Sequence, residues 1–149
     1  MRLVDAAGHL PTLKPLLAAV RWLRAIPYIG SGRVCPICER SSRKFRRYGE
    51  PRRHDAQCAH CGSLERHRLA WLFIRNRTDL FDGSTKSVLH VAPESCLEGR
   101  FRKRLGTSYL TADLLDDRAM VKMDVTNINF PDRSFDSIYC SHVLEHVSD

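Results

Sequence analysis

The chain has 149 residues, of which 43% are hydrophobic, and it carries a formal net charge of +7. This length allows one modest core and one small module, and it excludes two full-sized domains. Apolar runs stay far below the roughly 20 residues of a transmembrane helix, and the first residues lack the apolar core and cleavage site of a secretory signal. We therefore expect a cytoplasmic protein without a membrane span.

The positive charge is concentrated in the first half of the chain. Residues 1–77 hold 16 Lys and Arg against 5 Asp and Glu, whereas residues 78–149 hold 8 against 12. This difference predicts two units with different partners, the first of them suited to phosphates, nucleic acid or an acidic surface. A solvated basic face with no dedicated ligand is the alternative.

Residues 1–33 are predicted to hold one amphipathic helix and a linker. Apolar side chains recur at helical spacing between Lys14 and Ile26. Pro27, Gly30 and Gly32 then break the helix. Packing of this short helix on the rest of the chain is favoured over attachment to a membrane.

Residues 34–62 hold two Cys-x2-Cys pairs separated by nineteen residues. Each pair can bring two thiolates to one ion, and two pairs complete a tetrahedral zinc site. Reducing conditions in the cytoplasm disfavour disulfides, and four thiolates leave no open position, so the zinc is expected to be structural. His54 and His60 are expected to be surface residues or to lie around the ligands. The predicted ligands are Cys35, Cys38, Cys58 and Cys61.

The stretch between the two cysteine pairs is strongly basic and contains an aromatic residue, Tyr48. A zinc-held loop of this composition could contact phosphates and stack a base. It could equally be solvated. Its positively charged residues are Arg40, Arg43, Lys44, Arg46, Arg47, Arg52 and Arg53.

Residues 63–85 are predicted to form a connecting helix and a loop. Ser63 is expected to cap a helix that runs to about Arg77, and Asp82-Gly83-Ser84 marks the loop. The apolar side chains of this helix are Leu64, Leu69, Leu72 and Phe73.

Residues 86–149 predict a parallel α/β sheet, because short β-like runs alternate with helical or turn segments. The run 87–94 has the pattern of a buried strand ending in a tight turn that opens a helix, where a doubly wound sheet binds its cofactor. Asp113 follows about 20 residues later, where an acid accepts hydrogen bonds from ribose hydroxyls; capping of a turn is the alternative. The predicted strands are 87–91, 108–112, 121–123 and 135–140.

The stretch 122–147 contains Met-Asp-Val, Asn-Phe-Pro, Phe-Asp-Ser-Ile-Tyr and Leu-Glu-His. In this pattern the sequence resembles class I S-adenosylmethionine-dependent methyltransferases of the type-11 group. The resemblance covers about residues 86–149. With the cysteine pairs and Cys-Gly-Ser-Leu-Glu-Arg-His-Arg at 61–68, the chain is similar to a zinc-ribbon-bearing subset of that group. It implies a partial Rossmann-like sheet of about four strands behind a small zinc-ribbon-like module and an N-terminal helix.

The resemblance implies a transferase that uses S-adenosylmethionine on a small molecule, a saccharide or RNA. The turn Ala92-Pro93-Glu94 would line the methionine and ribose, and Asp113 would bind the ribose hydroxyls. Most members carry an acidic residue and Gly-x-Gly where this chain has 90–94, so its backbone approaches the cofactor less freely. No catalytic residue stands out. The expected cofactor-binding residues are His90, Ala92, Pro93, Glu94, Asp113, Asp124, Val125, Ser141 and His142.

Asp124 and Val125 would border the adenine, and Ser141 and His142 would face the cofactor or substrate. His142 and His146 are four residues apart, a spacing that can bind metal, but a position facing the cofactor cleft is favoured. The remaining thiols, Cys96 and Cys140, are expected to be small buried residues.

A complete domain of this class has seven strands, and only four are predicted here. The chain is therefore expected to be a C-terminally truncated fragment with little or no activity of its own. Its open sheet edge would favour self-association. The competing hypothesis is a zinc-dependent module that binds nucleic acid or protein, with a degenerate, non-catalytic Rossmann half. Affinity for the cofactor separates the two hypotheses.

Overall fold

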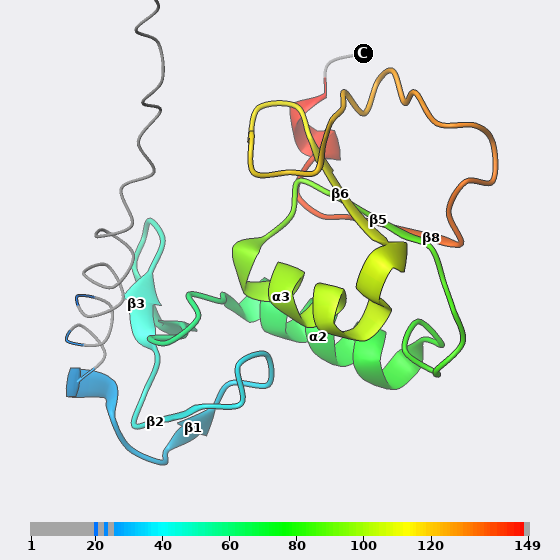
Figure 1. The fold of residues 1–149 in the computed structure, drawn as a ribbon. Coiled ribbons are helices and arrows are strands. Elements are labelled where there is room, and N and C mark those ends of the chain that lie inside the picture. Colours follow the sequence, from blue (N-terminus) through cyan, green and yellow to red (C-terminus); the bar gives the residue numbers. More distant parts are fainter. Residues whose placement is uncertain (1–19, 21–22, 24–25, 148–149) are drawn as a thin grey trace, which may run out of the picture.

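The structure, a computed structural model, describes residues 20, 23 and 26–147. Most of the helix predicted between Lys14 and Ile26 lies outside these residues; Val20 and Leu23 are helical and exposed. The described chain forms a small antiparallel module followed by a larger part built around a parallel sheet (Figure 1). None of the helices in the described part is long and apolar enough to cross a membrane.

The small module consists of a 3-10 turn and two short hairpins. Its elements are η1 (Ile26–Tyr28), β1 (Arg33–Val34), β2 (Ser41–Ser42), β3 (Arg46–Tyr48) and β4 (Arg53–Gln57). β1 pairs with β2 and β3 pairs with β4, antiparallel in both cases. The register shifts between Arg46 and Tyr48, and irregularities of this kind increase the local twist of a hairpin.

The larger part is built on a sheet of four parallel strands. They are β5 (Val88–Val91), β6 (Tyr109–Asp113), β7 (Val121–Lys122) and β8 (Ser137–Cys140). Their order is β7-β6-β5-β8, so the chain runs outward from β5 to β7 and then returns to place β8 on the other side of β5. This arrangement confirms the predicted α/β fold class, and each predicted strand boundary agrees with the observed one to within two residues.

Two helices lie on the same side of the sheet (Figure 1). They are α2 (Glu65–Arg77) and α3 (Ser95–Leu105), and two 3-10 turns, η2 (Gly106–Ser108) and η3 (Leu144–His146), complete the fold. Phe101 of α3 is fully buried, and its ring centroid lies 5.8 Å from that of Tyr109 and 5.6 Å from that of Tyr139. α3 therefore covers β5 and its two neighbours in the sheet.

The buried face of α2 differs from the one that its leucines suggest. Leu69 and Phe73 are 70% and 58% exposed, whereas the buried side chains of the helix are His67, Trp71 and Ile74. These three recur at the spacing of one helical face. The N-cap is Leu64 rather than Ser63, and it makes no side-chain capping bond.

The module and the sheet share one hydrophobic core. Cys35, Ile37, Phe45 and Cys58 of the module belong to the same buried cluster as Trp71 of α2 and Phe101 of α3. The guanidinium of Arg68 in α2 lies 4.4 Å from the centre of the Phe45 ring and donates to the carbonyls of Ala56 and Ser63. A module with few apolar side chains thus gains its core by packing on α2.

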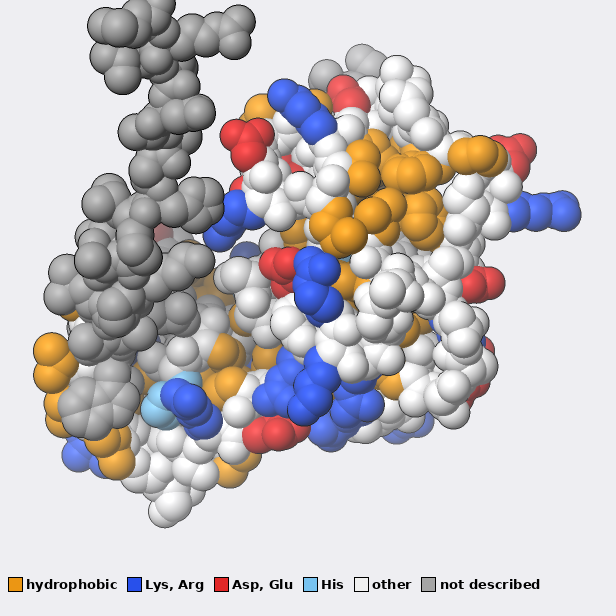
Figure 2. Space-filling view, viewed as in Figure 1, with side chains coloured by type: hydrophobic (Ala, Val, Ile, Leu, Met, Phe, Trp, Pro, Cys, Tyr) orange, Lys and Arg blue, Asp and Glu red, His pale blue; other side chains and the backbone are white. Residues whose placement is uncertain are grey.

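The opposite face of the sheet packs against the loop between β7 and β8. Leu89, Val91, Ala112 and Met123 form the buried cluster on this face. Phe130 and Phe135 of the loop pack against this cluster, with their rings edge to face at 5.0 Å. Figure 2 shows hydrophobic side chains gathered beside this loop.

Candidate functional site

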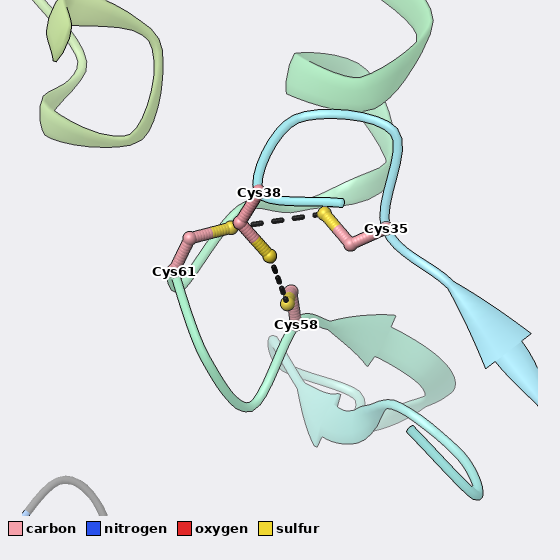
Figure 3. A group of neighbouring side chains, drawn as sticks. All are labelled: Cys35, Cys38, Cys58 and Cys61. Carbon is pink, nitrogen blue, oxygen red and sulfur yellow. Dashed lines mark hydrogen bonds between the residues drawn. The ribbon is translucent and has the colours of Figure 1, made fainter. Parts of the chain in front are cut away.

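The four cysteines of the module converge on one point (Figure 3). All four sulfur atoms lie within 4.8 Å of one another. Cys35 Sγ lies 3.7 Å from Cys61 Sγ, and Cys38 Sγ lies 3.8 Å from Cys58 Sγ. Among the described residues, this is the one group of three or more His, Cys, Asp or Glu side chains that could hold a metal ion.

Both cysteine pairs lie in matching turns. The Glu39 N–H donates to the Cys35 carbonyl at 2.8 Å, and the Gly62 N–H donates to the Cys58 carbonyl at 3.0 Å. Each turn ends in a left-handed residue, with φ of 61° at Glu39 and 76° at Gly62. Each turn directs its two sulfur atoms to the same side. This local geometry explains why two residues between the paired cysteines are enough to bring both sulfur atoms to one ion.

The donor set fits a zinc ion bound by four thiolates. Tetrahedral ligands at about 2.3 Å from zinc place their sulfur atoms about 3.8 Å apart, which matches the observed 3.7 and 3.8 Å. Disulfide sulfurs would lie about 2.05 Å apart, and all four cysteines are free. Hydrogen bonds from the thiols of Cys38, Cys58 and Cys61 hold the pKa of Cys35 far below its ordinary value. This favours a thiolate, the form that binds metal, at Cys35, whereas the same network raises the pKa of Cys38 and Cys58.

Ser63 is a neighbour of the cluster that the sequence did not suggest. It is fully buried, and its Oγ lies 3.4 Å from Cys35 Sγ and 3.2 Å from Cys61 Sγ. A hydroxyl in this position can donate to a metal-bound thiolate and hold it in place. The signal in the sequence was its place two residues after Cys61, which suggested a helix cap instead.

The two histidines beside the cysteines lie around the cluster rather than in it. His60 Nε2 is 3.2 Å from the Ser41 carbonyl, and the His60 N–H lies 3.4 Å from Cys58 Sγ. His54 Nδ1 accepts a hydrogen bond from Arg47 Nε at 3.2 Å. Neither imidazole belongs to the metal-ligand group of the described residues.

A second candidate site lies at the carboxyl ends of the four parallel strands. A pocket of about 410 Å³ elsewhere belongs to the small module, whereas this one, of about 580 Å³, is formed by residues that follow β5, β6, β7 and β8. Ligands of open α/β sheets bind at this edge, where the strand order reverses. The lining residues are Val91, Ala92, Asp113, Leu114, Leu115, Met123, Asp124, Val125, Thr126, His142, Val143, His146 and Val147.

Asp113 ends β6 at the pocket wall, and one of its oxygens caps a turn. Its Oδ1 accepts hydrogen bonds from the Leu115 N–H at 2.8 Å and the Asp116 N–H at 2.9 Å. Its Oδ2 receives no hydrogen bond from a described residue. The carboxylate is thus held in a fixed direction while one oxygen stays available for a ligand hydroxyl.

Asp124 and Val125 line the same pocket from the end of β7. Asp124 Oδ1 accepts from both the N–H and the hydroxyl of Thr126 at 2.8 Å, and these two donors hold the pKa of Asp124 below its usual value. Val125 is half-buried and packs against the cluster on the second face of the sheet. Together with Met123 and Val143, it gives the pocket an apolar wall.

Ala92 forms the tight turn after β5. Its backbone is left-handed, with φ of 49°, and its N–H donates to the Ala112 carbonyl at 2.8 Å. Glycine adopts this conformation without the steric cost that an alanine carries. The turn therefore has the shape that a glycine would favour, although the sequence has none at 90–94.

His90 and Glu94 are oriented toward each other beneath the helices. Glu94 Oε2 accepts from His90 Nε2 at 2.8 Å, so His90 Nδ1 is left to accept from the Tyr109 hydroxyl at 2.6 Å. Burial, the largest single influence, would raise the pKa of Glu94, but the hydrogen bond from His90 acts together with smaller electrostatic and backbone interactions to outweigh burial and lower this pKa. Glu94 Oε1 is buried without a partner among the described residues. Neither residue lines the pocket, and nor do Pro93 and Ser141.

His142 and His146 both line the pocket. The backbone of His142 is left-handed, with φ of 56°, and its Nδ1 lies 2.9 Å from Glu145 Oε1.

The two thiols outside the cluster differ from each other: Cys96 is half-buried, with its sulfur 3.3 Å from His67 Nδ1, whereas Cys140 is exposed. The expectation that Cys140 is buried is therefore wrong, because β8 has a neighbour on only one side among the described strands.

Sequence reasoning missed several pocket residues, chiefly those one or two positions beyond a strand end. Leu114 and Leu115 follow β6 directly and are both exposed, as is Thr126 beyond β7. The available signal in the sequence was the pair of leucines directly after Asp113, because large apolar side chains beyond a strand end can line a binding site.

Comparison with known proteins bears on the second part of the chain. Residues 95–149 match the family model described as a methyltransferase domain. No curated protein and no solved structure matches the chain. The matched range begins at α3 and includes the ends of β6, β7 and β8, which supply most of the pocket wall. The match supports a class I S-adenosylmethionine-dependent methyltransferase: residues 95–149 are similar to a methyltransferase domain, and they follow a zinc-ribbon-like four-cysteine module.

Proposed function

We propose that the pocket at the carboxyl ends of β5 to β8 binds S-adenosylmethionine and that the chain takes part in methyl transfer. One observation carries the proposal: the range that matches the methyltransferase family supplies the wall of a pocket at the edge where parallel sheets bind cofactors. A pocket of about 580 Å³ is within the range of small-molecule sites.

The lining suits the chemistry of this cofactor. The free Oδ2 of Asp113 can accept a hydrogen bond from a ribose hydroxyl, because Oδ1 is already held by the turn. Met123, Val125 and Val143 offer apolar surface to the adenine ring. The left-handed turn at Ala92 brings backbone rather than a long side chain to the pocket. The remaining expected cofactor residues do not line the pocket, and they would act at most by positioning those that do. They are His90, Pro93, Glu94 and Ser141.

The bound cofactor would supply an activated methyl group on a sulfonium. The remaining contribution of the chain is to hold the cofactor in one orientation and to keep water away from the reacting methyl. The exposed imidazoles of His142 and His146 lie on the pocket wall where an acceptor could approach. No described residue is assigned the role of a catalytic base.

We further propose that the cysteine cluster holds one structural zinc ion. Four sulfur ligands at tetrahedral spacing, with Ser63 beside them, leave no coordination position for a substrate. The metal would then act on folding, because the cluster lies in the core that the module shares with α2 and α3.

Isothermal titration calorimetry with S-adenosylhomocysteine tests the cofactor proposal. We expect one binding site per chain, and we expect ATP and NAD, which share the adenosine but not the amino acid, to bind far more weakly. Zinc content is measured on the same sample, so that a loss of fold is recognised. A folded, zinc-loaded chain with no affinity for S-adenosylhomocysteine would contradict the proposal and favour the zinc-dependent binding module.

A further inference from the structure

The module carries a basic pocket of its own, separate from the sheet. It has a volume of about 410 Å³ and lies between η1, the strand β3 and the strand β4. Its lining is positively charged and partly aromatic, and it contains a single acid. The lining residues are Tyr28, Lys44, Phe45, Arg46, Arg47, Arg52, His54 and Asp55.

The positive charge of this pocket is not balanced locally. Lys44, Arg47 and Arg52 form no ion pair with a described residue. Asp55 does not neutralise them, because its Oδ2 pairs with Arg33 at 3.2 Å and its Oδ1 accepts from the Phe45 N–H at 2.8 Å. Three uncompensated cations around one hollow repel one another, and a bound polyanion would remove that repulsion.

Polar and aromatic groups in the pocket are already oriented. Arg47 Nε donates to His54 Nδ1, so the ring's other nitrogen carries the hydrogen and can donate to a ligand. The guanidinium of Arg46 lies 5.2 Å from the centre of the Tyr28 ring. A planar cation beside an aromatic ring is a surface on which a nucleobase can stack.

The floor of the pocket is held by the rest of the molecule. Phe45 is only 8% exposed and is packed beneath the guanidinium of Arg68 from α2. Ala56 of β4 is fully buried, and β4 leads directly into the Cys58 turn of the metal cluster. The cations are thus presented by strands anchored on the shared core, which limits the ordering cost of binding.

We propose that this pocket binds single-stranded nucleic acid, with phosphates on Lys44, Arg47 and Arg52 and a base against Tyr28. An anionic membrane would also attract the charge, but membrane binding uses apolar side chains that protrude beside the cations. The aromatic residues of this pocket are recessed, since Phe45 is buried and Tyr28 is half-buried. The site goes beyond the proposed methyl transfer and does not depend on it.

The test measures fluorescence anisotropy of a labelled RNA of about 12 nucleotides with the full chain and two matched triple variants. The pocket variant is Lys44→Ala with Arg47→Ala and Arg52→Ala. The control is Arg75→Ala with Arg77→Ala and Lys103→Ala, which removes the same charge from exposed positions on α2 and α3. Zinc content and the melting temperature verify that both variants fold.

We expect the pocket variant to lose roughly ten- to hundredfold in affinity and the control to lose less than about threefold. Affinity is measured between about 50 and 200 mM salt, and log affinity is plotted against log salt. The slope of the pocket variant should be shallower than that of the wild type by about 2, because three phosphate contacts are lost and each contributes about 0.7 on a single strand. Tyr28→Ala should weaken binding severalfold, while Tyr28→Phe keeps it, because a stacking surface needs the ring alone.

Four results would overturn the assignment. The first is a wild-type chain that does not bind the RNA, and the second is an equal loss of affinity in both triple variants. Uridine monophosphate that binds as tightly as the oligonucleotide would identify a site for free nucleotides instead. Anionic vesicles that bind the wild-type chain, lose binding in the pocket variant and are not displaced by RNA would identify a membrane surface.

Discussion

The cysteine cluster and the sheet pocket are built in opposite ways. The cluster is local: two turns of the same shape bring four sulfur atoms within 4.8 Å, and two of the four cysteines, Cys35 and Cys58, are buried. The pocket is global, because its walls come from the ends of four strands that are adjacent only once the sheet has formed. Its acids, Asp113 and Asp124, are each fixed by hydrogen bonds to nearby residues of their own loop. A closed site of this kind serves folding, and an open one serves a ligand.

Removal of a cysteine of the cluster should have the largest effect, on both zinc content and stability. Cys58→Ser is expected to lower the zinc content from one ion per chain to a small fraction and to unfold the module, since on the order of 10 kcal/mol of zinc-binding free energy can be linked to folding. Because Cys58 lies in the shared core, the melting of the sheet should shift as well.

Cys140→Ser is the matched control, because Cys140 is an exposed thiol outside the cluster. It should keep both zinc and melting temperature. Elemental analysis with calorimetric melting measures the two quantities. Full zinc occupancy in Cys58→Ser, or equal loss in both variants, would contradict a four-thiolate structural site.

Truncation of a core side chain tests whether the module and the sheet share one core. Phe101→Ala should cost about 3 to 5 kcal/mol of unfolding free energy, because a large buried side chain leaves a cavity. Phe73→Ala makes the same change at a position that is 58% exposed, and it should stay within about 0.5 kcal/mol of the wild type.

Urea unfolding followed by circular dichroism gives both values. If Phe73→Ala proved the more costly of the two, the assigned buried face of α2 would be wrong. A Phe101→Ala variant that unfolds in two separate steps would show that the module and the sheet do not melt together.

Much of this contrast could be predicted from the sequence. The cysteine ligands follow from spacing alone, since each pair needs only one turn to bring its sulfur atoms together. The strands follow from short apolar runs between turn signals. The sequence offered Asp113 as a ribose acceptor, with a turn cap as the alternative; its Oδ1 caps a turn, and the ribose role stays a prediction.

Side-chain direction could not be predicted in the same way. All four residues of β5 are buried, so its pattern does not reveal that His90 faces the helices while Val91 faces the pocket. The apolar residues of α2 do not reveal its buried face either, because contact with α3 and the module favours burial of Trp71 and Ile74. Tertiary packing decided both cases.

A change of charge at Asp113 tests the pocket at the carboxyl ends of the strands. Asp113→Asn keeps an oxygen for the turn but loses the charge, and it should weaken binding of S-adenosylhomocysteine by about 1 to 3 kcal/mol. Asp117→Asn removes the same charge from an exposed position in the same loop that does not line the pocket. Calorimetric titration should show unchanged affinity for this control. Equal affinity in all three proteins would remove Asp113 from the site.

The smallest expected effect concerns the turn after β5. Ala92→Gly relieves a left-handed backbone that costs an alanine about 1 kcal/mol, and it should leave the unfolding free energy unchanged or raise it by up to about 1 kcal/mol. Ala112→Gly, in the middle of the sheet, should instead be destabilising. Urea midpoints compare the two, and a clear loss of stability in Ala92→Gly would contradict the turn conformation described above.

The location of the bound cofactor is the most direct test of the central claim. In an NMR titration of the isotope-labelled chain with S-adenosylhomocysteine, we expect the amide signals of Ala92, Asp113, Leu115 and Val125 to shift together. Signals of Arg133, in a hollow beside the loop between β7 and β8, and of Arg47, in the basic pocket, should stay in place. Shifts confined to either of those regions, or no shift at all in a folded and zinc-loaded chain, would contradict a cofactor site at the carboxyl ends of the strands.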